Sequence, residues 1–181
     1  MILFINACVR KQSRTKRLAD RLLAKKKQEI TEIRLEEFVF PPVNEAFLQK
    51  RDRLIKAKAF DDPSFALARQ FAEADEIVIA APFWDLSFPA SLKQYFEQIN
   101  VLGITFCYTR DGFPKGLCKA ERLTFVTTAG GDFFPEEYGF GYIKALAQTF
   151  YGIETVELLR ATGLDLDGRD PEAILDAALK Q

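Results

Sequence analysis

The chain has 181 residues, of which 48% are hydrophobic and 28% charged, as expected for one globular domain, residues 1–181, with a sizeable core. Its 25 Lys and Arg and 26 Asp and Glu give a net charge of −1, without the basic excess that a nucleic-acid-binding surface needs. It contains no His, which excludes Ser-His-Asp and Cys-His catalysis and removes the commonest metal ligand, so no metal site is predicted.

The cysteines and the apolar segments indicate where the protein works. Cys8, Cys107 and Cys118 form no CxxC pair and are odd in number, so we expect neither a disulfide framework nor a zinc site, and we predict a reducing compartment, the cytoplasm. Met1 is followed at once by apolar residues, without a basic region or a cleavage site, so no signal peptide is visible. No apolar run approaches the length of a membrane span.

The first third of the chain predicts two strands around a helix. Residues 2–5 are a continuous apolar run, typical of a central parallel strand buried on both faces. A polar loop, NACVRKQSRT, leads into a helix with apolar residues at helical spacing from Leu18 to Leu23. Polar and apolar side chains alternate over residues 29–35, which predicts a second strand, nearer an edge of the sheet. Residues 36–62 predict a long excursion with one or two short helices and no assigned role.

The rest of the chain continues the alternation of strands and helices. In order, we expect a helix over 63–74, a strand over 76–81, a helix that begins near Pro89, a small hairpin or extended loop over 104–117, a strand over 123–128, a helix around 142–150, a strand over 154–161 and a last helix capped by Asp170. Five strands alternating with helices predict a flavodoxin-like α/β fold. It is a three-layer sandwich in which a five-stranded parallel sheet of order 2-1-3-4-5 has helices on both faces.

In such a sheet, ligands bind beyond the carboxyl ends of the strands, near the switch in strand order. The loop after the first strand places Ser13, Arg14 and Thr15 at a helix N-terminus, where free N–H groups attract a phosphate. The alternative is that Ser13 or Thr15 only caps the helix and the basic residues are solvated. Because no GxxxxGK[ST] or GxGxxG is present, a P-loop and a dinucleotide fingerprint are excluded.

The loops after the third and fourth strands are also unusual. Phe83 and Trp84 lie between Pro82 and Pro89 and suit a wall for a flat aromatic ligand, although a hydrophobic plug or a dimer contact would use them equally. The sequence TTAGGDF has paired glycines that let a ligand approach the backbone, or that form an ordinary turn. A phosphate site, an aromatic wall and a glycine edge together describe a mononucleotide with a large planar ring, and we predict FMN, rather than FAD.

The segment APFWDLSFPASLKQYFEQINVLGITFCYT, followed by KGL and TTAGG, resembles the flavodoxin-like NAD(P)H:quinone oxidoreductases and FMN-dependent NADH-azoreductases, and the resemblance covers nearly the whole chain. It implies that flavin is held by Ser13, Arg14 and Thr15 at the phosphate, by Pro82, Phe83, Trp84, Asp85 and Leu86 along the isoalloxazine, and by Thr128, Gly130 and Gly131 at the pyrimidine end. Asp85 stands where the family usually has Asn. A flavin contact made by the backbone at this position would be kept, whereas a hydrogen bond donated by a side-chain amide would be lost.

The resemblance implies an FMN-dependent NAD(P)H oxidoreductase that reduces quinones, azo or nitro compounds by two-step, ping-pong hydride transfer through flavin N5, with NADH or NADPH as co-substrate. No side chain is assigned as acid or base, and Tyr108 is a candidate contact on the substrate side. The alternative is a flavodoxin-type FMN electron carrier, which a net charge of −1 disfavours because such carriers are usually strongly acidic. A receiver domain needs an acidic cluster after the first strand, where this chain has Asn6-Ala7-Cys8.

Aromatic residues at 83, 84, 88, 106, 108, 113, 133 and 134 fall, by this prediction, in or near the loops at one end of the sheet. A monomer would leave many of them in water as one apolar patch. Together with the resemblance, this predicts a homodimer whose interface completes the active site, with a small-molecule electron acceptor as partner and neither nucleic acid nor membrane.

Overall fold

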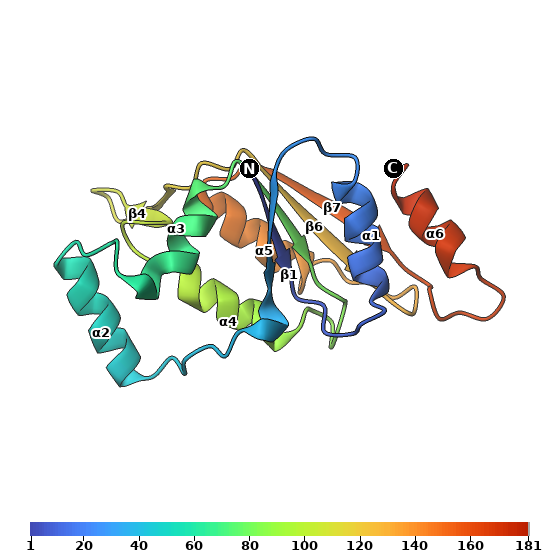
Figure 1. Ribbon diagram of the computed structural model, residues 1–181, viewed down its shortest axis with the longest axis horizontal. Coiled ribbons are helices and arrows are strands. Elements are labelled where there is room, and N and C mark those ends of the chain that lie inside the picture. The colour runs from blue at the N-terminus through green and yellow to red at the C-terminus, as the bar shows by residue number, and fades with distance from the viewer. Residues whose placement is uncertain (181) are drawn as a thin grey trace.

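A computed structural model describes residues 1–180 and contains a five-stranded parallel sheet of order β2-β1-β3-β6-β7 (Figure 1). The strands are β1 (Ile2–Asn6), β2 (Ile30–Arg34), β3 (Glu76–Ala80), β6 (Arg122–Thr128) and β7 (Thr155–Ala161). The predicted strand order is confirmed, and the strand boundaries differ by a residue or so at the ends. Every residue of β1 and β3 is buried, whereas the edge strand β2 buries one residue of five.

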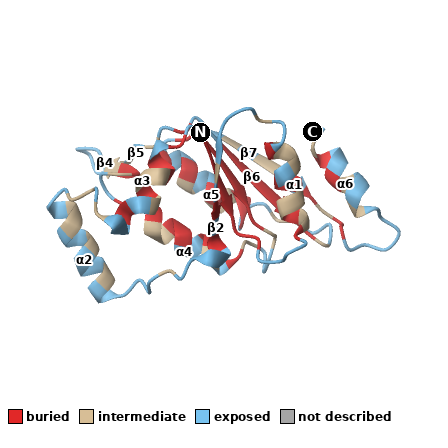
Figure 2. Ribbon diagram, in the orientation of Figure 1, coloured by how far each residue is buried: buried red, intermediate tan, exposed pale blue. Residues whose placement is uncertain are grey.

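Helices cover both faces of the sheet. The helices α1 (Arg14–Leu23) and α6 (Pro171–Ala178) pack on one face with a core that includes Phe4, Val78 and Val126. The helices α3 (Ala66–Glu73), α4 (Ala90–Ile99) and α5 (Phe140–Leu146) pack on the other face, which holds the larger core (Figure 2). A single 3₁₀ turn, η2 (Pro63–Phe65), precedes α3, so the helix expected over 63–74 is made of two pieces.

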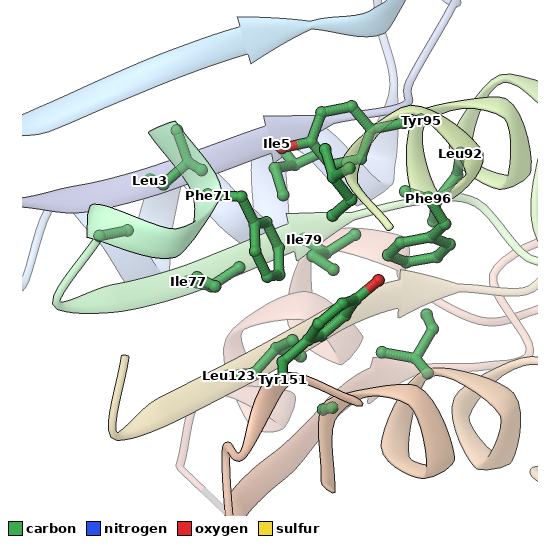
Figure 3. Packing of buried hydrophobic residues seen from close by; sticks show 14 of the residues in the cluster. Leu3, Ile5, Phe71, Ile77, Ile79, Leu92, Tyr95, Phe96, Leu123 and Tyr151 are labelled. Carbon is green, nitrogen blue, oxygen red and sulfur yellow. The ribbon is translucent and has the colours of Figure 1, made fainter. Parts of the chain in front are cut away.

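Large aromatic side chains fill the larger core (Figure 3). Phe71 meets the ring of Tyr151 edge-on at 4.7 Å, in the geometry that the ring quadrupoles favour. The hydroxyl of Tyr151 donates to Asn100 at 2.8 Å, and burial raises its pKa well above the ordinary value. Tyr151 ends the π-helical turn η3 (Ala147–Tyr151), which continues α5.

The excursion over residues 36–62 contains the short turn η1 (Leu35–Glu37) and one helix, α2 (Glu45–Lys56). Asn44 caps α2 by accepting a hydrogen bond from the N–H of Phe47 at 3.0 Å. No residue of α2 is buried, and the helix stands beside the body of the domain (Figure 2). Together with residues 38–42 and 63–67 it lines an apolar groove of about 660 Å³.

The predicted hairpin forms from the antiparallel strands β4 (Phe106–Tyr108) and β5 (Pro114–Gly116). It lies near the amino ends of the sheet strands, because Lys119 and Glu121 just after it donate to Ala72 and Asp75, directly before β3. Gly116 packs so closely against the backbone at Tyr151 that a Cβ atom would collide with it. The prediction that all the clustered aromatics share one end of the sheet is therefore wrong for the three on this hairpin.

Candidate functional site

A cleft of about 290 Å³ opens at the carboxyl ends of four neighbouring strands, β1, β3, β6 and β7. Residues 9, 10, 12–15, 82–84, 128–130, 164 and 165 line it. The three loops that the sequence singled out therefore meet in one place, because the carboxyl ends of parallel strands share an edge of the sheet. The contribution of the loop after β7 was missed, since nothing in the local sequence of residues 162–166 distinguishes it from a surface turn.

Eight of the predicted cofactor residues line this cleft: Ser13, Arg14, Thr15, Pro82, Phe83, Trp84, Thr128 and Gly130. Asp85, Leu86 and Gly131 lie outside the lining, so their contact with a flavin stays a prediction. Tyr108 is on the hairpin, is 55% exposed and does not line the cleft of its own chain.

Ser13 caps α1. This is one of the two roles that the sequence suggested for the first loop. Its hydroxyl oxygen accepts a hydrogen bond from the N–H of Lys16 at 3.2 Å, and it keeps its own proton for donation. The N–H groups of Arg14 and Thr15 belong to the first helical turn and have no acceptor within the helix. Capping therefore leaves two backbone donors and a hydroxyl at the positive end of the helix dipole, where they can hold an anion.

A hydrogen bond between two threonines joins this helix to the sheet. The hydroxyls of Thr15 and Thr128 lie 2.7 Å apart, and both residues are buried. The bond fixes the start of α1 against the end of β6, so the first and third loops of the cleft have a set spacing. Both hydroxyls thus act in positioning the two loops.

Arg14 reaches across the cleft to the loop after β7. Its guanidinium donates to the carbonyl of Leu164 at 2.6 Å and pairs with the carboxylate of Asp165. These bonds use two of its five N–H donors, so it can still bind an anion while it holds this loop. Arg10 also lines the cleft and forms no ion pair among residues 1–180.

The second loop turns sharply at its tip. Trp84 and Ser87 exchange backbone hydrogen bonds of 3.1 and 2.7 Å, and between them Asp85 and Leu86 have φ of +49° and +67°. Two consecutive positive φ values define a type I′ turn, which usually contains Asn or Gly. Asp tolerates this conformation almost as Asn does, so the backbone geometry explains how Asp85 can stand where the resembling family has Asn. Leu86 is strained there, at a cost of about 1 kcal/mol.

Aromatic side chains wall the other end of the cleft. Phe83 packs against Phe134 with ring centroids 4.6 Å apart, and the guanidinium of Arg160 covers Phe134 at 5.3 Å. The N–H of Phe83 donates to the carbonyl of Thr128 at 3.1 Å, which fixes the wall to the end of β6. Trp84, beside it, is 36% exposed and so is free to contact a ligand.

Cys8 lies behind the first loop and takes no visible part in the cleft's chemistry. Burial raises the pKa of its thiol to about 11, so it is protonated at neutral pH and a poor nucleophile. Within residues 1–180 no three His, Cys, Asp or Glu side chains are grouped as metal ligands. No helix in the same part of the chain is long and apolar enough to cross a bilayer.

Comparison with known proteins identifies relatives along the whole chain. A family model described as the flavodoxin-like fold matches residues 1–181. The chain is 34% identical to the FMN-dependent NADH:quinone oxidoreductase of Coprothermobacter proteolyticus over 180 residues, which cover 94% of this chain and 89% of the relative. It is also 34% identical to the enzyme of the same name from Lachnoclostridium phytofermentans, over 95% of this chain and 90% of the relative.

Solved structures agree with these relatives. An azoreductase from Bacillus anthracis str. Sterne superposes with a TM-score of 0.83 at 26% identity, covering 99% of this chain and 94% of that one. An FMN-dependent NADH-azoreductase from Bacillus anthracis str. Ames Ancestor, solved in complex with FMN, superposes with a TM-score of 0.81 at 25% identity, covering 99% and 93%.

Proposed function

The chain belongs to the flavodoxin-like fold family, and from this membership we propose that it is an FMN-dependent NADH:quinone oxidoreductase that also reduces azo compounds. The observation that carries the proposal is the cleft, where a donor-rich helix N-terminus and an aromatic wall face each other across the ends of β1, β3 and β6. Relatives aligned over nearly the full length are named as this activity, and a superposable azoreductase contains FMN.

The residues of the cleft fit FMN. A phosphate suits the first turn of α1, where the N–H groups of Arg14 and Thr15, the hydroxyl of Ser13 and the guanidinium of Arg14 are donors. A planar ring suits the other end, between the Phe83–Trp84 wall and the backbone at Gly130.

When bound, FMN would supply the redox chemistry, the transfer of a hydride from NADH to the electron acceptor in two steps. The residues of the chain itself bind and orient the cofactor and the substrate, and they exclude water. Phe83, packed on Phe134, shields the aromatic end from solvent, and the Thr15–Thr128 bond holds the two loops at a constant spacing. We assign no side chain as acid or base, because the one carboxylate in the lining, Asp165, is paired with Arg14.

We propose a homodimer in which the hairpin of one copy lies over the cleft of the other. Two sets of exposed aromatics support it: Phe133 and Tyr138 beyond the end of β6, and Tyr108 and Phe113 on the hairpin, which are 55–75% exposed. One chain cannot bring its own hairpin to its own cleft, since the two lie at opposite ends of the sheet. A twofold axis would pair the two sets, cover both, and bring Tyr108 to the substrate side of the partner's site.

A cytoplasmic location is part of the proposal. Cys8, Cys107 and Cys118 are free thiols, and such cysteines persist in a reducing compartment. Cell fractionation with antibody detection tests this, and recovery of the protein in the culture medium or the membrane pellet would contradict it.

The purified protein tests the activity directly. We expect a yellow preparation that releases FMN on heating and that oxidises NADH steadily when a benzoquinone or an azo dye is supplied. A flavodoxin-type electron carrier would also be yellow but would not oxidise NADH by itself, so the NADH assay separates the two readings. Rates with NADPH, measured in parallel, give the co-substrate preference.

Sedimentation of the flavin-loaded protein across a dilution series tests the dimer. We expect the Phe113→Asp variant to dissociate at higher concentrations than the wild type, because it places a charge in the proposed interface. The Lys180→Asp variant, which adds a carboxylate at the exposed end of α6, on the other side of the sheet from the hairpin (Figure 1), is the control. A species of monomer mass with full activity would refute both the dimer and the shared site.

A further inference from the structure

Asp165 stands out among the residues of the cleft because its charge has the wrong sign for a phosphate site. The charged residues of the lining are Arg10, Arg14 and Asp165, and the carboxylate of Asp165 pairs with the guanidinium of Arg14. A cleft that only had to attract a phosphate would gain from leaving Arg14 uncompensated. Its neutralisation within the cleft therefore requires an explanation.

The backbone holds Asp165 firmly in this position. Its N–H donates to the carbonyl of Gly130 at 2.9 Å, and the N–H of the nearby Leu164 donates to the carbonyl of Ala129 at 3.3 Å. The carboxylate lies against Gly130 so closely that a Cβ atom at that position would collide with it. The absence of a side chain at Gly130 thus makes room for the Asp165 carboxylate beside the cleft.

We propose that Asp165 sets the charge of the flavin-phosphate subsite and so determines how strongly the cleft prefers FMN to riboflavin. The inference rests on the proposed function, in which the phosphate lies at the start of α1. A phosphate monoester carries a charge of about −1.5 to −2 at neutral pH, whereas riboflavin carries none. A carboxylate that shares Arg14 with the phosphate opposes FMN and leaves riboflavin unaffected, so it restrains the affinity gained from the phosphate.

The size of the effect is bounded by exposure. The side chain of Asp165 is 65% exposed and that of Arg14 is 34% exposed, so water and salt screen the interaction. Removing one carboxylate charge at this range should tighten FMN binding by about three- to tenfold at low ionic strength. The gain should shrink as salt is added, because screening weakens the repulsion that the substitution removes.

The test compares FMN and riboflavin binding to the reconstituted protein by quenching of flavin fluorescence. The Asp165→Asn variant keeps the size of the side chain and an oxygen for Arg14, and removes only the charge. We expect it to bind FMN about three- to tenfold more tightly and riboflavin within about twofold of the wild type. Asp165→Ser, also neutral, should change FMN binding in the same direction and guards against a folding defect in the first variant.

Asp167→Asn is the matched control, because Asp167 is exposed nearby in the chain and does not line the cleft. The inference is overturned if Asp165→Asn weakens FMN, if it alters FMN and riboflavin equally, or if Asp167→Asn gives the same gain. Wild-type protein that binds no FMN would instead refute the proposed function itself, and the inference with it.

Discussion

We expect the substitution of valine for two adjacent threonines of β6 to change the free energy of unfolding in opposite directions. The hydroxyl of Thr128 lies 2.7 Å from that of Thr15, and both are buried. The hydroxyl of Thr127 is buried without a hydrogen-bond partner among residues 1–180. The two side chains point to opposite faces of the sheet, as neighbours in a strand must. Thr128→Val breaks a bond, and Thr127→Val removes an unpaired polar atom.

The magnitudes follow from the chemistry of each position. Thr128→Val loses a hydrogen bond worth about 0.5–1.5 kcal/mol and leaves the Thr15 hydroxyl unpaired at a cost of about 1–3 kcal/mol, offset in part by a buried methyl group worth about 0.8 kcal/mol. We expect its free energy of unfolding to fall by about 1–4 kcal/mol. Thr127→Val loses no bond and gains the methyl group, so its stability should be unchanged or higher by up to about 1 kcal/mol.

Urea unfolding of the flavin-free protein, followed by circular dichroism, measures both variants. Flavin is left out because a ligand of the native state would add its own binding energy to the apparent stability. Equal m-values in all three proteins make the midpoints comparable. In a chain of this length, each kcal/mol corresponds to a shift of about 2–4 °C in the thermal midpoint. The reasoning is refuted if Thr127→Val costs as much as Thr128→Val, or if Thr128→Val matches the wild type.

Three further predictions concern the hairpin and the thiols. In thermal melts, Gly116→Ala should lower the free energy of unfolding by about 3 kcal/mol or more, because the added Cβ meets rigid backbone. Gly112→Ala, at φ +83° in open space, should lower it by only about 1 kcal/mol, and equal losses in the two variants would contradict this prediction. Maleimide at pH 8, followed by mass spectrometry, should modify Cys107 and spare the buried Cys8, and rapid modification of Cys8 would show that the first loop opens. Because burial raises the pKa of Cys8 to about 11, the contribution of this thiol to stability is lost as the pH rises from about 9 towards 11. Tyr108→Phe should change the preference among quinone and azo acceptors more than the rate of flavin reduction by NADH in stopped flow, and a thousandfold loss in that step would show a catalytic role.

The sequence by itself determined the fold and the place of the cleft. Continuous apolar runs over residues 2–5 and 76–81 indicated strands buried on both faces. The alternation of strands and helices predicted a parallel sheet of order 2-1-3-4-5, which the structure confirms. Three unusual loops then pointed to one edge of that sheet. These features can be read without coordinates, because the apolar pattern of a buried strand and the capping residue of a helix each lie within a few consecutive residues.

The tertiary structure alone decided which side chains meet. Asp165 comes about 150 residues after Arg14, and no pattern near either of them indicates that they pair across the cleft. The hairpin with Tyr108 could be recognised as a hairpin, but its position at the far end of the sheet follows from how Gly116 packs on the turn after α5. Such contacts depend on the summed lengths and directions of several elements, and small differences in each accumulate over the chain, so only the folded structure defines them.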